Sequence, residues 1–493
     1  MNIPLVGRIE EQNQLQRAYD SHEAELIAVY GRRRVGKTFL IRSWASAKSS
    51  KSCLFFQVSG IYGADISVQL REFRMEIERA FYDHHAGSLL QDPENWVAAF
   101  NLLREAIDKM SGRKKIILFF DEFPWMATKK SNLLQALDYQ WNRFLVNNPR
   151  IKMIICGSSA SWIIEKILNN KHGLHNRVTK RIHLEPFNLY ETHLYLKSRK
   201  IGFNPSQVLE LYMCLGGIPF YLKSMEKGLS AVQNINALCF MKQGDLFDEF
   251  KNLFSSLFEN AHFHEEIIRL MASKREGISR SHIENLYKTK GGRLSLRLRE
   301  LEEAGFIKKF VPLGRIRGSY YRIIDEYTLF YLKWIEPTLQ NALSAQWNDE
   351  YWEALSHSAS WKAWSGYAFE AICYKHLPQI RKVLKIPNGS VASSWKHIGK
   401  GEKDEGAQID LLFERPDNAT TICEIKYYKT PFEINKEVAS DLNRKTKVFQ
   451  RVRKSEKQIF ISMITSSRLK KNLYAEDLVA SEVTIEDLFL EPS

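Results

Sequence analysis

The feature that most constrains this chain is the octapeptide GRRRVGKT at residues 31–38, which lies between two regular patterns. The apolar run ELIAVY at residues 25–30 predicts a short buried strand, and residues 39–47 predict a helix. In this setting the glycines let backbone amides turn toward a phosphate, and the helix start adds partial positive charge. The pattern therefore predicts an α/β fold on a parallel sheet, with a phosphate-binding site at a strand end.

A site of this kind also needs an acid at the end of a second strand, and the segment KIILFFDE at residues 115–122 supplies one. Asp121 is expected to contact a magnesium ion that Thr38 also holds, and Glu122 to polarise the attacking water. Lys37 is expected to reach the β- and γ-phosphates of ATP. The alternative is an acidic pair that only caps a helix, which the apolar run ahead of the pair disfavours.

Further candidate residues surround this loop. A third predicted strand, residues 152–158, ends in Gly-Ser-Ser, and Ser158 is a candidate to sense the γ-phosphate or position the water; a plain strand-end turn is the alternative. Arg177 is a candidate arginine finger, and a solvated arginine is the alternative. The residues of the loop and helix start expected to bind ATP are Gly31, Arg32, Arg33, Arg34, Val35, Gly36, Lys37, Thr38 and Phe39.

Five ordered motifs together resemble the archaeal-type ATPase family of prokaryotes, an AAA-related, signal-transduction type of P-loop NTPase. They are LVGR with Glu10, GRRRVGKT, FFDEF, GSS, and GGIP at residues 216–219. The resemblance covers residues 1–340 and implies an ATPase core at 1–200, a helical lid at 201–262 and a winged helix at 263–340. It also implies that Arg8 lies by the base and that Pro219 approaches the nucleotide. From its residues alone, GGIP is a simple loop between lid helices.

The middle of the chain has helical spacing over residues 204–258, and residues 265–322 predict helices followed by a hairpin through Gly318. Ser279 or Ser281 is the expected cap of the second of these helices, and Gly305 ends the third. Residues 274–322 hold 13 Lys and Arg against 5 Asp and Glu, a net charge of +8 out of +14 for the whole chain. Phosphate contacts with DNA are expected here, and a merely solvated basic face is the alternative.

The last third carries a second constellation of chemistry-bearing residues. Residues 407–413 and 420–427 predict two paired strands, with Asp410 on the first and Glu424 and Lys426 on the second. Because Glu424 and Lys426 are two apart on one strand, their side chains face the same side, which Asp410 can also reach. Two carboxylates can bind Mg²⁺ and a lysine can orient a water or stabilise negative charge, as in phosphodiester hydrolysis.

This constellation resembles the PD-(D/E)xK nuclease fold found as the C-terminal domain of the same ATPases, and the resemblance covers residues 345–493. It implies metal ligation by Asp410 and Glu424, and it implies that Glu370, on a predicted helix at residues 365–376, completes the site. The leading proline is absent, since Gln408 and Ile409 precede Asp410. A charged hairpin face, or a fold that binds DNA without cutting it, is the alternative.

Composition bounds the remaining possibilities. Six cysteines are scattered singly, which favours buried, reduced thiols over disulfides or a zinc site. A membrane span and a signal peptide are not expected, and the cytoplasm is the expected location. Residues 444–471 hold 10 Lys and Arg against one Glu, so nucleic acid, most of all DNA, is the expected partner. The sequence thus predicts an ATP-regulated, DNA-interacting enzyme with a magnesium-dependent nuclease domain, which forms a homo-oligomer if Arg177 acts in trans. The alternative is a signalling ATPase whose nuclease-like domain only binds DNA or a protein partner.

Overall fold

The computed structural model divides the chain into two compact units. It describes residues 5–82, 90–128, 130–169, 173–258, 260–274, 277–287, 291–310, 313, 319–341, 351–399 and 404–491. The first unit comprises Met1–Pro186 and Ser295–Gly305, and the second comprises Phe187–Leu294 and Phe306–Ser493. The first segment of this unit thus ends before residue 200, the predicted end of the ATPase core, and a second segment returns to the unit at residues 295–305.

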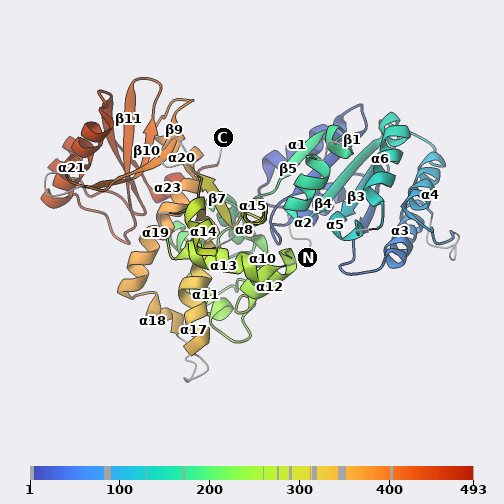
Figure 1. The fold of residues 1–493 in the computed structure, drawn as a ribbon, viewed down its shortest axis with the longest axis horizontal. Helices are drawn as coiled ribbons and strands as arrows, with labels where there is room; N and C mark the ends of the chain where they lie inside the picture. Colours follow the sequence, from blue (N-terminus) through green and yellow to red (C-terminus); the bar gives the residue numbers. More distant parts are fainter. Residues whose placement is uncertain are drawn as a thin grey trace. The chain divides into compact units, whose positions relative to one another are not determined.

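The first unit is built on a parallel five-stranded sheet with the order β2-β3-β4-β1-β5 (Figure 1). Its strands are β1 (Glu25–Tyr30), β2 (Cys53–Ser59), β3 (Lys115–Asp121), β4 (Ile151–Gly157) and β5 (Lys180–His183). Because all the strands run the same way, their carboxyl ends lie along one edge. The predicted strands at residues 25–30, 115–122 and 152–158 are confirmed to within one residue at each end.

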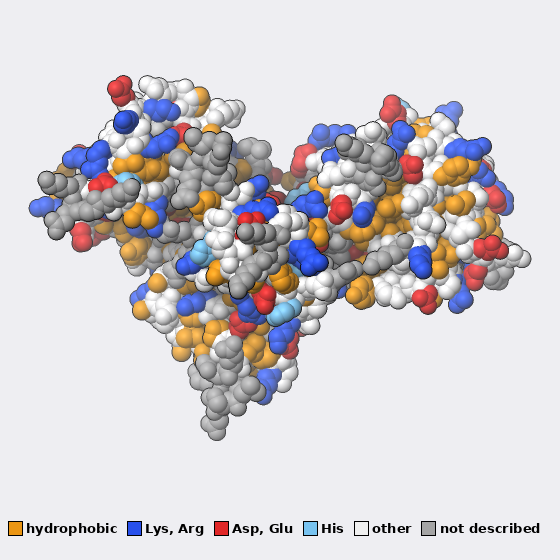
Figure 2. Space-filling model, viewed as in Figure 1, with side chains coloured by type: hydrophobic (Ala, Val, Ile, Leu, Met, Phe, Trp, Pro, Cys, Tyr) orange, Lys and Arg blue, Asp and Glu red, His pale blue; other side chains and the backbone are white. Residues whose placement is uncertain are grey.

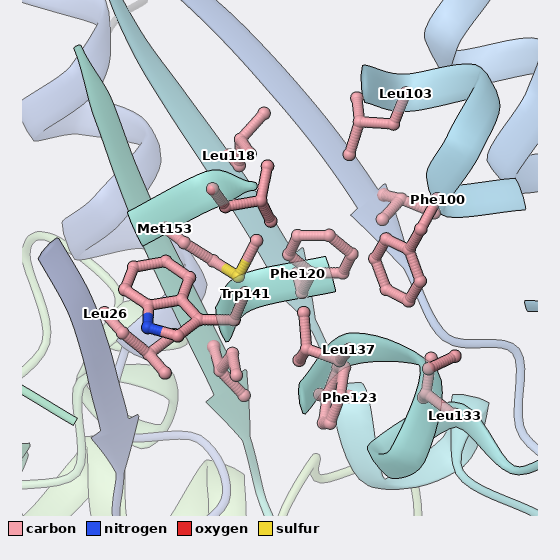
Figure 3. Packing of buried hydrophobic residues seen from close by; sticks show 14 of the residues in the cluster. Leu26, Phe100, Leu103, Leu118, Phe120, Phe123, Leu133, Leu137, Trp141 and Met153 are labelled. Atoms are coloured by element: carbon pink, nitrogen blue, oxygen red, sulfur yellow. The ribbon is translucent and has the colours of Figure 1, made fainter. Parts of the chain in front are cut away.

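Helices cover this sheet. They are α1 (Ile9–Asp20), α2 (Lys37–Ser46), α3 (Ile66–Phe81), α4 (Trp96–Asp108), α5 (Phe123–Met126), α6 (Leu133–Arg143) and α7 (Ala160–Trp162), with the short helices η1 (Leu145–Asn147), η2 (Ile163–Leu168) and η3 (Leu174–Asn176). Figure 3 shows the core between sheet and helices, where Phe120 of β3 meets Phe100 of α4 and Phe123 of α5. Such aromatic rings bury large apolar areas, so this packing fixes the direction in which β3 delivers Asp121 and Glu122.

The second unit begins with helices. They are α8 (Leu189–Ser198), α9 (Pro205–Leu215), α10 (Pro219–Lys223), α11 (Ala231–Cys239) and α12 (Glu249–Leu257). Capping boxes begin α8, α9 and α11, where Asn188, Asn204 and Ser230 accept hydrogen bonds from backbone amides. The helices predicted from the apolar spacing of residues 204–258 are present as α9 to α12.

A small mixed segment follows, in the order α13 (Ala261–Ala272), β6 (Ile278–Ser279), α14 (Arg280–Tyr287), α15 (Gly292–Glu303), β7 (Ile307–Phe310) and β8 (Tyr320–Ile323). The three strands form an antiparallel sheet with the order β6-β8-β7. Ser279 is the cap expected for the second helix, since its Oγ accepts from the His282 amide at 3.2 Å. Gly318, the expected hairpin residue, lies outside the described residues.

The C-terminal part of the second unit holds a mixed five-stranded sheet. The order is β13-β12-β11-β10-β9, with antiparallel pairing from β9 to β11 and parallel pairing from β11 to β13. Its strands are β9 (Val391–His397), β10 (Ala407–Glu414), β11 (Ala419–Lys426), β12 (Gln458–Thr465) and β13 (Ser481–Val483). The helices of this region are α16 (Glu326–Phe330), η4 (Tyr331–Ile335), α17 (Glu336–Asn341), α18 (Tyr351–Leu355), α19 (Ala359–Lys375), α20 (Leu377–Val383), α21 (Lys436–Arg453), α22 (Leu473–Leu478) and α23 (Ile485–Leu488).

Two of these helices position the site residues of the sheet. The α21 helix packs on β10 through Val448 and Phe449 (Figure 1). The α19 helix packs against β11 and buries Phe369 and Ile372. Within the described ranges, no helix has the length and apolar character that a membrane span requires.

Candidate functional site

The loop at residues 31–36 joins β1 to α2 at the carboxyl edge of the first sheet. Gly31 has φ 147°, and a Cβ atom there would lie 2.2 Å from the carbonyl oxygen of Leu184. Gly36 has φ 94° and precedes the first residue of α2. A side chain at either position would strain the backbone, so both glycines serve the shape of the loop.

Lys37 folds back over this loop. Its Nζ donates hydrogen bonds to the carbonyl oxygens of Gly31 at 3.0 Å and Arg32 at 2.9 Å. Burial lowers the pKa of Lys37, although the nearby carboxylates of Asp121 and Glu122 oppose that effect. The ammonium group therefore lies inside a ring of backbone groups, held by neutral carbonyls that anionic phosphate oxygens would outcompete.

Thr38 and Asp121 meet across the site. The Thr38 hydroxyl donates to Asp121 Oδ1 at 3.1 Å, and the Glu122 amide donates to the same oxygen at 3.1 Å. Asp121 is 5% exposed, and burial raises its pKa. A hydroxyl and a buried carboxylate are hard oxygen donors of the type that Mg²⁺ prefers, so these residues fit the ion implied by the motif.

Ser158 holds the side chain of Glu122. Glu122 Oε2 accepts hydrogen bonds from the Ser158 amide at 3.0 Å and from the Ser158 hydroxyl at 2.8 Å. The Glu122 backbone is left-handed, with φ 45°. A Cβ on Gly157 would lie 2.7 Å from Pro124, so a glycine at this strand end lets α5 approach. The structure thus brings Ser158 to Glu122, as expected of a residue at the site.

The other predicted nucleotide residues are placed as follows. Arg8 is 5% exposed and its guanidinium lies 3.4 Å from the carbonyl oxygen of Val35, which places it at the loop. Phe39 is 41% exposed on α2. Arg177 is exposed just after η3, and Pro219 is the first residue of α10 in the second unit. The expected roles of these four residues stay predictions.

The second group of site residues lies on β10 and β11. Leu411 pairs with Cys423, so Asp410 and Glu424 are neighbours on the adjacent strands. Asp410 Oδ2 accepts from the Ile425 amide at 3.3 Å, and the Tyr374 hydroxyl donates to the Asp410 carbonyl oxygen at 2.6 Å. Burial, reinforced by the Glu424 carboxylate, raises the pKa of Asp410 to about 6.

Glu424 contacts two lysines. Lys445 of α21 donates to both carboxylate oxygens at 2.8 Å, and Lys426 Nζ lies 2.9 Å from Oε1. Burial alone would lower the pKa of Lys426, but the Glu424 carboxylate outweighs it and the pKa is raised. The convergence of Asp410, Glu424 and Lys426 expected from the strand pattern is therefore present.

Lys445 is a contact that the sequence pattern did not single out. The basic segment at residues 444–471 begins within α21, where Lys445 lies on the same helix face as the buried Leu442 and Phe449. A lysine three residues after one core residue and four before another was the available signal, because such spacing places it over the sheet. Other cations of α21 also bind acids of the same region, namely Arg451 with Asp404 and Arg453 with Glu414.

Glu370 lines a cavity of about 1100 Å³ that Asp410 and Lys426 also line. Glu370 is half-buried on α19. Among the residues that the structure describes, no group of three or more His, Cys, Asp and Glu side chains is arranged to hold a metal ion. The cavity thus combines acidic and basic groups, while Glu424 itself is enclosed by its lysines.

The parallel sheet, the loop around Lys37 and the Thr38–Asp121 pair define the first unit as a P-loop ATPase domain. Residues 5–225 match the family described as an ATPase domain predominantly from Archaea. Over 455 residues the chain is 26% identical to an uncharacterized protein of Methanocaldococcus jannaschii, covering 90% of this chain and 92% of that protein. An uncharacterized ATP-binding protein of the same organism is 43% identical over 54 residues, which cover 11% of this chain and 92% of that protein.

Among solved structures, the Walker-type ATPase of Pyrococcus abyssi is similar to this chain with a TM-score of 0.44 and 17% identity. The match covers 67% of this chain and 96% of that chain.

Proposed function

We propose that this protein is a magnesium-dependent ATPase that regulates a nucleic-acid-cleaving site in its second unit. In the first unit, Lys37 binds the β- and γ-phosphates, and Thr38 and Asp121 hold Mg²⁺, which would neutralise charge on the phosphates. Glu122 accepts the proton of the attacking water. The bond from Ser158 to Glu122 supports these roles, because it orients the carboxylate at the strand end that carries Asp121.

The remaining nucleotide contacts complete this proposal. Arg8 lies by the base, Pro219 approaches the nucleotide from the lid, and Arg177 contacts the γ-phosphate within one chain or across a homo-oligomer. Beyond the ATPase core at residues 1–200, the chain comprises a lid at residues 201–262, a winged helix at 263–340 and a nuclease-like domain at 345–493. The order helix, strand, helix, helix, strand, strand from α13 to β8 supports the winged helix.

In the nuclease-like domain, Asp410 and Glu424 would hold Mg²⁺, which requires that Lys445 release the Glu424 oxygens to which it now donates. Glu370 would complete the site, and Lys426 would orient a water or stabilise charge on the phosphodiester. The ion would supply polarisation of that phosphodiester. The observation that supports this assignment is the convergence of Asp410, Glu424 and Lys426 at one end of β10 and β11. Figure 2 shows several separate Lys and Arg side chains, mixed with acidic ones, on the part of the second unit that holds α21 and its sheet, and such cations would contact the phosphates of a DNA partner.

The test is nicking of supercoiled plasmid with Mg²⁺, with and without ATP. We expect the wild-type protein to nick, and the Asp410→Ala and Lys426→Ala variants to be inactive. Arg415→Ala is the matched control, because Arg415 lies at the far end of β10 and pairs with Asp417. Equal inertness of the wild type and both variants on DNA and RNA would refute the nuclease assignment.

A second candidate function is a signalling ATPase whose nuclease-like domain binds a partner without cutting it. The specific observation in its favour is Glu424, whose two oxygens are taken by Lys445. Filter binding over a salt series separates the candidates, because nucleic-acid phosphate contacts weaken steeply with salt. Nucleotide-dependent assembly with no affinity for DNA would favour the signalling candidate.

A further inference from the structure

The cavity beside Asp410 has walls from two parts of the second unit. One wall holds residues of β7 and β8, including Phe310 and Arg322, and the other holds residues of α19, β10 and β11. The cavity volume of about 1100 Å³ suits one strand of a few nucleotides rather than an enclosed duplex, whose major groove alone is about 12 Å wide.

The charge of the lining suits a polyanion. In the described part of the chain, the cations that line the cavity are Arg322, Lys362, Lys396, Lys426 and Lys429. The carboxylates among the lining residues are Glu370 and Asp410. Lys426 pairs with Glu424, and Lys429 lies 3.9 Å from Glu210. Arg322, by contrast, makes no ion pair with any described residue.

Arg322 is held by rings rather than by acids. Its guanidinium lies 4.2 Å from the ring centroid of Tyr374 and 5.3 Å from that of Phe310. The Tyr374 hydroxyl is bound to the Asp410 carbonyl oxygen, so the ring beneath Arg322 is fixed relative to the strand that carries Asp410. The buried Nε of Arg322 has no hydrogen-bond acceptor among the described residues. Stacking thus orients a guanidinium whose donor capacity is left for a ligand, and planar phosphate recognition is its characteristic use.

Tyr428 offers an exposed ring on a fixed backbone. It lies two residues after Lys426, lines the same cavity and is 49% exposed. Its amide donates to Ser466 Oγ at 2.7 Å, and the Ser466 hydroxyl donates to its carbonyl oxygen at 2.8 Å. An exposed aromatic ring beside cations is the arrangement on which single-stranded nucleic acids stack their bases.

We propose that this cavity binds one strand of DNA, with Arg322 holding a backbone phosphate and Tyr428 stacking a base, so that the strand reaches Asp410 and Lys426. The inference rests on the proposed nucleic-acid function and adds the substrate form: unpaired strands, such as frayed ends or flaps, rather than continuous duplex. It also makes the small three-stranded sheet part of the site, through β8.

The test is fluorescence anisotropy with the full-length protein in EDTA, where cleavage cannot interfere. The probes are a labelled single strand of about 12 nucleotides, within the range of single-strand site sizes, the blunt duplex of the same sequence, and the RNA strand. We expect the single DNA strand to bind at least about tenfold more tightly than the duplex. Arg322→Ala and Tyr428→Ala should each weaken strand binding about tenfold, typical of a phosphate contact or a stacked base.

Two conservative variants separate binding from folding. Arg322→Lys should recover part of the affinity, since it keeps the charge but not the planar donor set, and Tyr428→Phe should recover nearly all of it. Arg415→Ala is the control, because Arg415 also lies over a ring, Phe460, but at the far end of β10. Melting temperatures of all variants report folding independently.

The outcomes distinguish this inference from the proposed function. Equal affinity for strand and duplex, or unchanged binding by Arg322→Ala and Tyr428→Ala, overturns the inference even where the protein still nicks plasmid. Strand-selective binding that both variants weaken supports it even where nothing is cut. A protein that binds the RNA strand alone overturns the DNA assignment, and one that binds no nucleic acid overturns both proposals.

Discussion

The imidazole of His376 accepts a hydrogen bond of 3.0 Å at Nε2 from the backbone amide of Leu189. Its Nδ1 lies 2.8 Å from the carbonyl oxygen of Ile372, one turn earlier on α19. The ring therefore carries its proton on Nδ1, and it joins the end of α19 to the first residue of α8. The helix that carries Glu370 and Tyr374 is thus tied to the start of α8.

This bond makes the stability of the second unit depend on pH. Burial lowers the pKa of His376 to about 4, whereas an unfolded histidine titrates near 6.5. As pH falls from 7 toward 4, the unfolded chain takes up a proton that the folded chain refuses, so stability is lost in that window. We expect a loss of about 2 kcal/mol between pH 7.5 and pH 5.0 from this residue.

Urea unfolding of wild type and His376→Gln at both pH values measures this effect. The glutamine variant should be less stable at pH 7.5 and should show a smaller loss on acidification. An identical pH dependence of the two proteins would contradict the assignment of this titration to His376.

ATP hydrolysis should depend on two residues in different ways. Lys37→Ala removes the ammonium that lies within the loop, so nucleotide binding should be abolished. Glu122→Gln keeps the size of the side chain but removes the base, so binding should persist while turnover falls about a hundredfold. Binding of a fluorescent ATP analogue and release of phosphate measure the two steps. Unchanged rates in both variants would refute the site.

The hydrogen bond between Ser158 and Glu122 can be tested with Ser159, the next residue, as the control position. Ser158→Ala removes a hydroxyl that orients a carboxylate, so kcat should fall about tenfold while ATP affinity changes little. Ser159→Ala alters an adjacent hydroxyl for which no bond to Glu122 is found in the described residues, and its kcat should stay near that of the wild type. Equal rates for the two variants would show that the orientation of Glu122 does not limit hydrolysis.

Lys445 and Glu424 form a buried ion pair, so substitutions of the two residues should have coupled effects on the free energy of unfolding. Lys445→Met leaves the carboxylate with one lysine and should lower the free energy of unfolding by about 3 kcal/mol. Adding Glu424→Gln removes the buried carboxylate that has lost one of its two lysines, so the double variant should recover part of that loss. A thermodynamic cycle from urea unfolding of the four proteins gives the coupling energy. Strictly additive losses would mean that the two side chains do not interact.

The parts of the fold that the sequence predicted are those whose information is local. The loop around Lys37 and the hairpin with Asp410 and Glu424 each occupy one short stretch, where spacing alone decides which side chains meet. The contact between Ser158 and Glu122 could not be predicted from one stretch of sequence, because it depends on the parallel pairing of β3 with β4. The family match then confirms the ATPase domain that the local motif indicated.

The parts that could not be predicted depend on distant segments. The strand β12 runs parallel to β11 through the crossover helix α21, so its place in the sheet is set by packing rather than by its own pattern. Lys445 reaches Glu424 only because of that crossover. Arg322 stacks on Tyr374, 52 residues later, because a strand of one small sheet faces a helix of another region.

The chain enters the first unit a second time at Ser295–Gly305, and this has a consequence for how the protein can be divided. A fragment that stops at Pro186 lacks Leu298 and Leu301, which are almost completely buried in the intact chain. Recombination at a single junction in the chain therefore cannot transfer the complete ATPase unit to another protein. Exchange between relatives must carry the segment through residue 305, and with it the helices from α8 to α14, so the ATPase unit and these helices are inherited together.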